Sequence, residues 1–195
     1  MMKDFYIEYN NIVKGEELSI ENRKKYDSIF PKELIDIWDE HGLASFNKGI
    51  FSLVNPEESI DIIEDLKVKD ALFKIKSREF YVFGKTAFGS VFILSIEPEK
   101  TSVIVYDILY SDYSVIISDS DFDFMFNVLF LDESVKREEL SEELFRECYE
   151  KLGALESDEC YGFVPLPALG GDKTIEYAEK VKFREYLSIC AQAQM

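Results

Sequence analysis

The stretch that constrains the fold most strongly is Cys160-Tyr161-Gly162-Phe163-Val164-Pro165-Leu166-Pro167-Ala168-Leu169-Gly170-Gly171. Its two prolines bias the residues before them, Val164 and Leu166, towards an extended conformation, so a regular helix does not fit here. The Gly170-Gly171 pair allows a sharp change of direction, because glycine has no Cβ and reaches positive φ without a clash. The stretch therefore predicts a buried strand that runs into a structured loop.

The length and composition of the chain predict a folded protein with a sizeable core. The chain has 195 residues, enough for one large domain or for two small domains packed tightly together. Hydrophobic residues make up 47% of the chain and aromatic residues 14%, which argues against intrinsic disorder. The sequence shows no internal repeat, low-complexity segment or linker, so we expect its two halves to share one core.

The chain is strongly acidic. It has 22 Lys and Arg residues against 39 Asp and Glu residues, which gives a net charge of -17. Such a charge repels DNA, RNA and anionic membrane surfaces, and it favours basic partners. Two interpretations remain open: the charge attracts a basic protein partner, or it only keeps the protein soluble.

Cysteine usage and the N-terminal residues favour a reducing compartment. Cys148, Cys160 and Cys190 lie far apart without a CxxC pair or a His-rich tract, which argues against a disulfide framework or a zinc site. We expect them to be small buried hydrophobic residues. The N-terminal residues lack the pattern of a signal peptide, and no window approaches the ~20 apolar residues of a membrane span. The sequence therefore predicts a cytoplasmic protein.

The N-terminal part of the chain predicts helices with recognisable ends. A capping residue or a proline opens each of them, and Gly42 closes the second one, which carries Trp38 on its apolar face. The expected elements are a helix over residues 20–28 capped by Ser19, a helix from Pro31 to Gly42, a strand over residues 49–54 and a helix from Asn55-Pro56 to about Leu66.

Residues 79–117 predict an antiparallel meander. Runs of β-branched and aromatic residues alternate here with glycine turns and with the turn sequence Glu97-Pro98-Glu99-Lys100. The expected strands are Phe80–Phe83, Val91–Leu94, Val103–Tyr106 and Tyr113–Ile117.

Three helices are expected after the meander. The first runs from Phe122 to about Leu131 after a cap at Ser120 or Asp121, and its apolar residues, including Phe124 and Val128, predict burial on most of its circumference. The second follows Ser141 as a cap, and the third contains Phe183 to Cys190. The whole pattern predicts an α+β fold with a mainly antiparallel central sheet and helices packed around it.

The sequence contains no recognisable catalytic or metal-binding set. The single histidine, His41, is expected to pack at the end of its helix, and the acidic neighbours of Cys160 would raise the pKa of its thiol rather than lower it. Residues 119–130 fail as a calcium loop because Phe occupies its sixth and twelfth positions, and residues 170–174 lack the spacing of a phosphate-binding loop. We therefore predict no catalytic residue, no cofactor and no metal, and an enzyme is the least favoured class of function.

Two sets of stretches resemble known families. Residues 30–42 (FPKELIDIWDEHG), 49–56 (GIFSLVNP) and 86–89 (TAFG) resemble the GAD-like domain. Residues 152–155 (LGAL), 158–165 (DECYGFVP) and 168–171 (ALGG) resemble the companion C-terminal domain of immunity proteins against type VI secretion DNase effectors, the Tde/Tdi group. This pairing is more distantly similar to the SMI1/KNR4 superfamily. The resemblance implies an SMI1/KNR4-like α+β fold, with a GAD-like half over residues 1–110 and a Tdi-type half over residues 111–195 in one integrated structural unit.

The resemblance implies that the protein neutralises a toxin by binding it, without catalysis. A nuclease needs a basic surface for phosphates, and an acidic protein can occlude that surface after fast, electrostatically steered association. The implied partner is a basic cognate toxin such as a type VI DNase effector, with no nucleic-acid or membrane partner and a monomeric free state. An alternative is a protein-interaction scaffold or regulatory module of the SMI1/KNR4 kind.

Acidic, exposed segments are the expected places for contacts with a basic toxin, and a tyrosine among carboxylates suits an anchor with a charged rim. Helix capping and solvated loop ends explain the same residues without any partner. The candidate contact residues are Asp107, Tyr110, Asp112, Asp119, Asp121, Asp123, Asp132 and Glu133.

Overall fold

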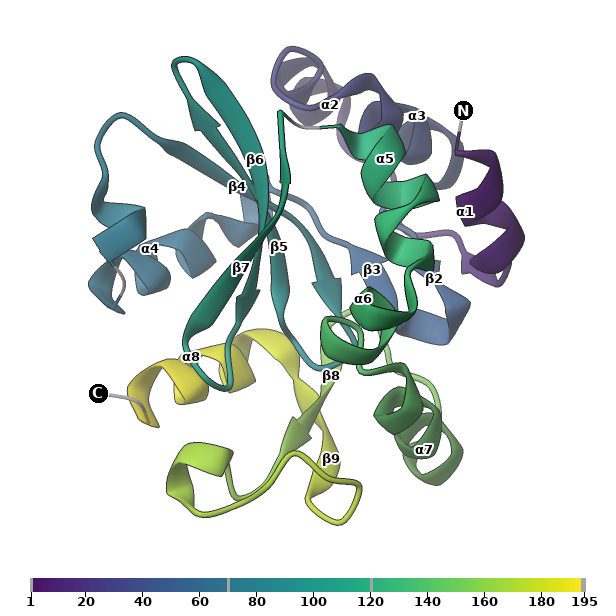
Figure 1. Ribbon diagram of the computed structural model, residues 1–195, viewed down its shortest axis with the longest axis vertical. Coiled ribbons are helices and arrows are strands. Elements are labelled where there is room, and N and C mark those ends of the chain that lie inside the picture. Colours follow the sequence, from purple (N-terminus) through teal and green to yellow (C-terminus); the bar gives the residue numbers. More distant parts are fainter. Residues whose placement is uncertain (1, 70, 120, 194–195) are drawn as a thin grey trace.

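The computed structural model describes residues 2–69, 71–119 and 121–193 (Figure 1). Within these residues, seven strands form one antiparallel sheet, in which each strand pairs with its neighbours in the chain. The predicted α+β fold with a mainly antiparallel sheet is confirmed, and β7 forms one edge of that sheet. The strands are β1 (Ile12–Val13), β2 (Ser45–Phe46), β3 (Phe51–Leu53), β4 (Glu79–Thr86), β5 (Val91–Glu97), β6 (Lys100–Asp107) and β7 (Asp112–Ser118).

Helices pack around the sheet (Figure 1). They are α1 (Lys3–Glu8), α2 (Ile20–Tyr26), α3 (Lys32–His41), α4 (Ile60–Lys69), α5 (Phe122–Asn127), α6 (Glu133–Glu138), α7 (Glu142–Leu152) and α8 (Phe183–Ala193). The short 3-10 turns are η1 (Asn47–Gly49), η2 (Glu57–Ser59), η3 (Ala71–Lys74), η4 (Leu129–Leu131) and η5 (Pro167–Leu169). Helix α4 contacts β4 and α8, whereas α5 contacts α1 and α3.

Aromatic rings fill the space between the sheet and α5. The ring centroid of Phe126 lies 4.8 Å from that of Phe5 in α1 and 5.4 Å from that of Phe130 in η4. Phe130 in turn lies 5.1 Å from Phe51 of β3 and 5.5 Å from Phe92 of β5. All five side chains are fully buried. Segments that are far apart in the sequence therefore share one aromatic cluster.

The helix that the sequence predicts over residues 122–131 is interrupted. Val128 leaves helical geometry at φ -124°, and η4 follows it, which brings Phe130 into the aromatic cluster. Burial is also confined to one side, because Phe124 is 43% and Val128 is 49% exposed. The expectation that this helix is buried on most of its circumference is therefore wrong. Apolar residues on the outer side of α5 face solvent instead.

A second sheet contains the apolar stretch near the C-terminal end. β8 (Glu159–Phe163) pairs with β9 (Ala178–Lys182) in antiparallel fashion. The backbone N–H of Tyr161 donates to the carbonyl of Ala87 at 2.8 Å, which joins β8 to the turn after β4. Residues 164–171 then form a loop that contains η5. The predicted buried strand running into a loop is confirmed.

The helix ends at Ser19 and Gly42 follow the predicted pattern, whereas the one at Ser141 does not. The hydroxyl of Ser19 accepts a hydrogen bond from the backbone N–H of Asn22 at 3.1 Å, which caps α2. Gly42 follows α3 at φ 65° and donates its N–H to the carbonyl of Trp38 at 2.9 Å. Ser141 precedes α7 but makes no capping bond, because its backbone is left-handed at φ 50° instead of extended.

The two glycines at the end of the apolar stretch serve different purposes. Gly170 has a φ of 91°, whereas a Cβ on Gly171 would lie 1.8 Å from the carbonyl oxygen of Pro165. We expect Gly171→Ala to lower the free energy of unfolding by about 2–3 kcal/mol, because a backbone carbonyl has to move. Gly170→Ala serves as the control and should cost about 1 kcal/mol, the strain of a left-handed alanine. Urea unfolding measures both, and equal losses would contradict this distinction.

Candidate partner-binding surface

Of the two residues most open to a catalytic interpretation, Cys160 is fully buried and His41 is partly buried. The His41 ring meets the ring of Tyr6 edge-on, with 5.5 Å between centroids. Burial raises the pKa of the Cys160 thiol to about 12, so the thiol is protonated at neutral pH and is a poor nucleophile. Among the described residues, no group of three or more His, Cys, Asp or Glu side chains could hold a metal ion. None of the described helices is long and apolar enough to span a membrane.

Lys85 is a buried charged residue that the sequence did not reveal. Its ammonium group donates to the carbonyl of Glu159 at 2.6 Å and lies 4.7 Å from the centroid of the Phe183 ring. Burial lowers the pKa of the Lys85 amine to about 8. The lysine therefore connects β4 to the first residue of β8. Its place at the end of an apolar strand offers no sequence signal of burial.

The first group of predicted contact residues lies in the turn between β6 and β7. The carboxylate of Asp107 accepts from the backbone N–H of Leu109, and that of Asp112 accepts from the N–H of Tyr113, both at 2.8 Å. Tyr110 lies between them and is 56% exposed. The turn thus presents a tyrosine between two carboxylates, as the sequence predicts.

The second group surrounds the start of α5. Asp121 caps this helix by accepting from the backbone N–H of Phe124 at 2.9 Å, whereas the other candidate cap, Ser120, lies outside the described residues. Asp123 accepts from the side-chain amide of Asn127 at 3.0 Å. Asp119 is exposed and has a φ of 65°. The capping role that the sequence suggests for this group is therefore met by Asp121.

The third group begins α6. Asp132 caps this helix, and its bonds to the hydroxyl and backbone N–H of Ser134 lower the pKa of its carboxyl group. Glu133 lies 3.3 Å from the ammonium group of Lys136, which also pairs with Glu8 at 2.7 Å. These carboxylates thus have local partners, while Asp132 and Glu133 remain exposed at the surface.

The predicted residues do not form one compact acidic patch. The β6–β7 turn and Asp119 lie at opposite ends of β7. A strand of that length spans about 20 Å, since each residue advances it by about 3.3 Å. The carboxylates therefore border a larger surface that contains β7 and α5.

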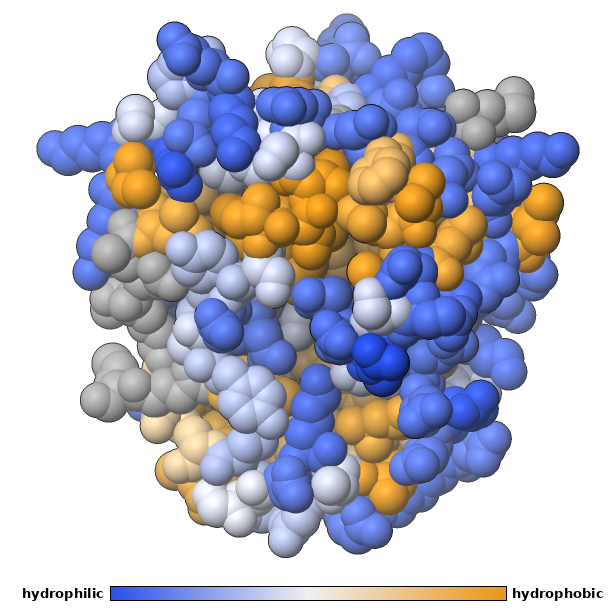
Figure 2. All heavy atoms as spheres, in the orientation of Figure 1, coloured by the Kyte–Doolittle hydropathy of each residue, from blue (hydrophilic) through white to orange (hydrophobic). Residues whose placement is uncertain are grey.

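An apolar band lies between these acidic groups. Figure 2 shows hydrophobic side chains gathered over β7 and α5. Its exposed apolar members include Val115 of β7, at 54% exposure, together with Phe124 and Val128, and Tyr113 of β7 is 40% exposed. Sequence reasoning missed this band, because apolar residues in a strand or an amphipathic helix are normally assigned to the core. An apolar centre with a polar rim is the usual arrangement of a protein-binding surface, and the polar rim is acidic here.

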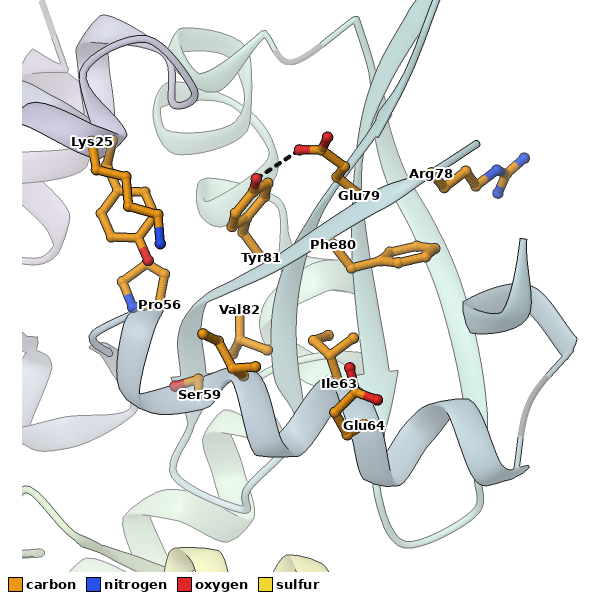
Figure 3. Close-up of a pocket in the computed structure, with 12 residues that line it drawn as sticks. Lys25, Pro56, Ser59, Ile63, Glu64, Arg78, Glu79, Phe80, Tyr81 and Val82 are labelled. Atoms are coloured by element: carbon orange, nitrogen blue, oxygen red, sulfur yellow. Dashed lines mark hydrogen bonds between the residues drawn. The ribbon is translucent and has the colours of Figure 1, made fainter. Parts of the chain in front are cut away.

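A pocket between α2, α4 and β4 is a weaker candidate (Figure 3). It has a volume of about 260 Å³, and Ile63 and Val82 line it. Its polar side chains are paired with one another or with nearby residues. The Tyr26 hydroxyl donates to Glu57 at 2.8 Å, and the Tyr81 hydroxyl donates to Glu79 at 2.7 Å. Such pairing favours a structural role for this pocket.

Comparison with known families finds a match for each of the two parts of the chain. Residues 1–107 match the GAD-like domain, and residues 123–194 match the C-terminal domain of the T6SS immunity protein Tdi1. The chain belongs to the GAD-like family, and its C-terminal part matches the Tdi1 C-terminal domain. The resemblance to these two domains is thereby confirmed, whereas the more distant similarity to the SMI1/KNR4 superfamily stays a prediction. Strand β7 lies between the two matched ranges.

A solved structure supports the fold of this GAD-like protein. The crystal structure of Atu4351 from Agrobacterium tumefaciens is similar to it, with a TM-score of 0.76 and 19% sequence identity. The similarity covers 99% of this chain and 89% of that protein. At this identity it shows a shared fold alone. Comparison with curated proteins finds no match.

Proposed function

We propose that this protein is a non-catalytic immunity protein that binds and neutralises a cognate basic toxin of a type VI secretion system. The observation that carries the proposal is the match of residues 123–194 to the C-terminal domain of the immunity protein Tdi1. The toxin class that we propose is a DNase, and the site of action is the cytoplasm. The free protein is a monomer.

Electrostatics support this proposal. A nuclease toxin binds phosphates through basic residues, and a protein of net charge -17 is attracted to such a surface over a long range. The exposed tyrosines and the apolar band can supply short-range contacts once the two proteins meet. Binding in this way blocks the toxin without any chemical step.

The proposal is tested by capturing the toxin from native cells on the immobilised protein at low and at high salt. We expect one basic protein to be retained in one-to-one amounts and to kill cells when it is expressed alone. Co-expression with this chain should restore growth. Recovery of many unrelated proteins would favour a scaffold, and the absence of a lethal protein would contradict the immunity function.

A triple substitution tests whether the acidic group around α5 contributes to steering. We expect Asp119→Asn, Asp121→Asn and Asp123→Asn together to slow association with the captured toxin about tenfold at low salt, because they remove three nearby carboxylates. Asparagine still caps a helix, so α5 should persist. Stopped-flow measurements give the association rate.

The matched control removes three exposed carboxylates from α7 by Glu143→Gln, Glu147→Gln and Glu150→Gln. It changes the net charge by the same amount at a different place. An equal slowing by both triple variants would show that only total charge matters and would exclude the α5 group as the contact region.

A further inference from the structure

The outer edge of β7 is open. Strand β7 ends the sheet order, and within residues 2–69, 71–119 and 121–193 no further strand pairs with its outer side. The opposite edge is the two-residue strand β1, whereas β7 has seven residues. A long open edge strand can pair with an extended segment of another chain.

The backbone of β7 can provide hydrogen bonds to such a segment. The N–H of Tyr113 is 2.8 Å from the carboxylate of Asp112, so it is directed to that side chain. In an antiparallel pair, alternate residues direct their N–H and C=O groups away from the partner strand. Val115, two residues later, is therefore expected to direct its backbone groups outward like Tyr113.

The features that usually protect an edge strand do not cover this half of β7. The sequence of the strand, Asp112 to Ser118, contains neither Lys nor Pro. The register of the β6–β7 pair shifts between Val115 and Ile117, so the distortion lies towards the far end of the strand. Residues 112–115 pair regularly with β6 and are exposed.

The charges around this edge select a basic occupant. Asp107 and Asp112 lie at one end of the strand, and Asp119 follows the other end. The carboxyl group of Glu139 bonds to Ser114 midway between them, with Lys173 as a basic neighbour. A second copy of this chain would bring the same acidic groups together across the new strand pair, at a charge of -17 for each copy. Like charges disfavour that dimer.

We propose that β7 binds an extended basic segment of a partner protein as an additional antiparallel strand, with Tyr113 and Val115 contacting its apolar side chains. The identification of that partner as the toxin rests on the proposed function. The pairing itself does not, because it depends on the edge of β7 and on its charge.

The test uses an acetylated octapeptide of alternating Lys and Val, titrated at low salt into isotopically labelled protein. We expect the largest NMR shift changes at the amides of residues 112–115. Val115→Pro should weaken binding at least about tenfold, because proline has no N–H to donate, whereas Val115→Thr keeps the donor and should bind within about threefold of wild type. Thermal unfolding establishes that each variant is folded.

Two peptide controls keep the test independent of how Val115→Pro folds. The same peptide with methylated backbone nitrogens retains its charges and side chains but cannot donate, so it should not bind. A peptide of alternating Glu and Val should not bind either. Unchanged amides at residues 112–115, equal binding of the methylated peptide, or equal binding of the acidic peptide would overturn the proposal.

The outcome of this peptide experiment does not depend on the outcome of the toxin experiment. If the protein neutralises its toxin but does not bind the Lys-Val peptide, the immunity function holds and the β7 binding site does not. If the protein binds the peptide but protects cells from no toxin, the β7 binding site holds and the proposed immunity function does not.

Discussion

Replacing Phe126 with alanine is expected to lower the free energy of unfolding by about 4 kcal/mol. The ring is fully buried and lies 4.8 Å from Phe5 and 5.4 Å from Phe130, centroid to centroid. Its removal leaves a cavity where α1, α5 and the sheet meet, and it also removes edge-to-face ring contacts. Urea unfolding with tryptophan fluorescence provides the measurement.

Phe124→Ala is the matched control for this prediction. It removes the same side chain from the same helix, but Phe124 lies in the exposed apolar band, so the loss should stay within about 0.5 kcal/mol. Similar losses for Phe124→Ala and Phe126→Ala would contradict the assignment of the two sides of α5.

The second large effect concerns Lys85 and depends on pH. Burial lowers the pKa of this amine from 10.5 to about 8 in the folded protein. Below about pH 8 the lysine is charged in both the folded and the unfolded state, and the folded state is penalised for burying the charge. Between about pH 8 and 10.5 the folded state loses the proton first, so unfolding takes up a proton and stability rises with pH.

Comparison with Lys85→Met isolates this contribution. Relative to that variant, wild type should gain about 3 kcal/mol of stability as the pH rises through this window. Unfolding at a series of pH values gives the difference at each pH. Lys100→Met, which changes an exposed lysine, should show no such relative gain. A constant difference between wild type and Lys85→Met would show that the amine of Lys85 has no lowered pKa.

The sequence predicted most of the sheet because its signals are local. Strands β4 to β7 are runs of β-branched and aromatic residues between turn residues, and their pairing in chain order follows from short connections. Strand β9 was missed because Glu179, Lys180 and Lys182 are exposed and only Ala178 is fully buried, so it carries no apolar pattern. The division of the chain near residue 110 stays a prediction.

The break in the helix after β7 results from packing against distant residues, which the sequence alone does not show. Residues 122–131 are almost continuously apolar, so their pattern does not tell which side chains face the core. The position of Phe130 between Phe51 and Phe92 requires the break at Val128. For the same reason, the sequence pattern did not predict that the side chain of Phe124 is exposed.

The sequence indicated the charged residues of the candidate surface but not its apolar centre. Residue type and turn position suffice to place Asp112 and Asp119 at strand ends, where carboxylates are exposed. That β7 is an edge strand follows from the order of strands in the sheet, which involves contacts between distant residues. The role of all eight candidate residues in binding stays a prediction.

The most direct test of the account titrates the activity of the captured toxin with increasing amounts of this protein. Neutralisation by binding predicts a straight-line loss of activity that reaches zero at one equivalent of protein. The toxin should regain its activity when the complex is dissociated in denaturant and the two proteins are separated and refolded. Loss of activity at far less than one equivalent, or toxin that stays inactive after separation, would show that the protein acts as an enzyme on the toxin and would contradict a binding mechanism.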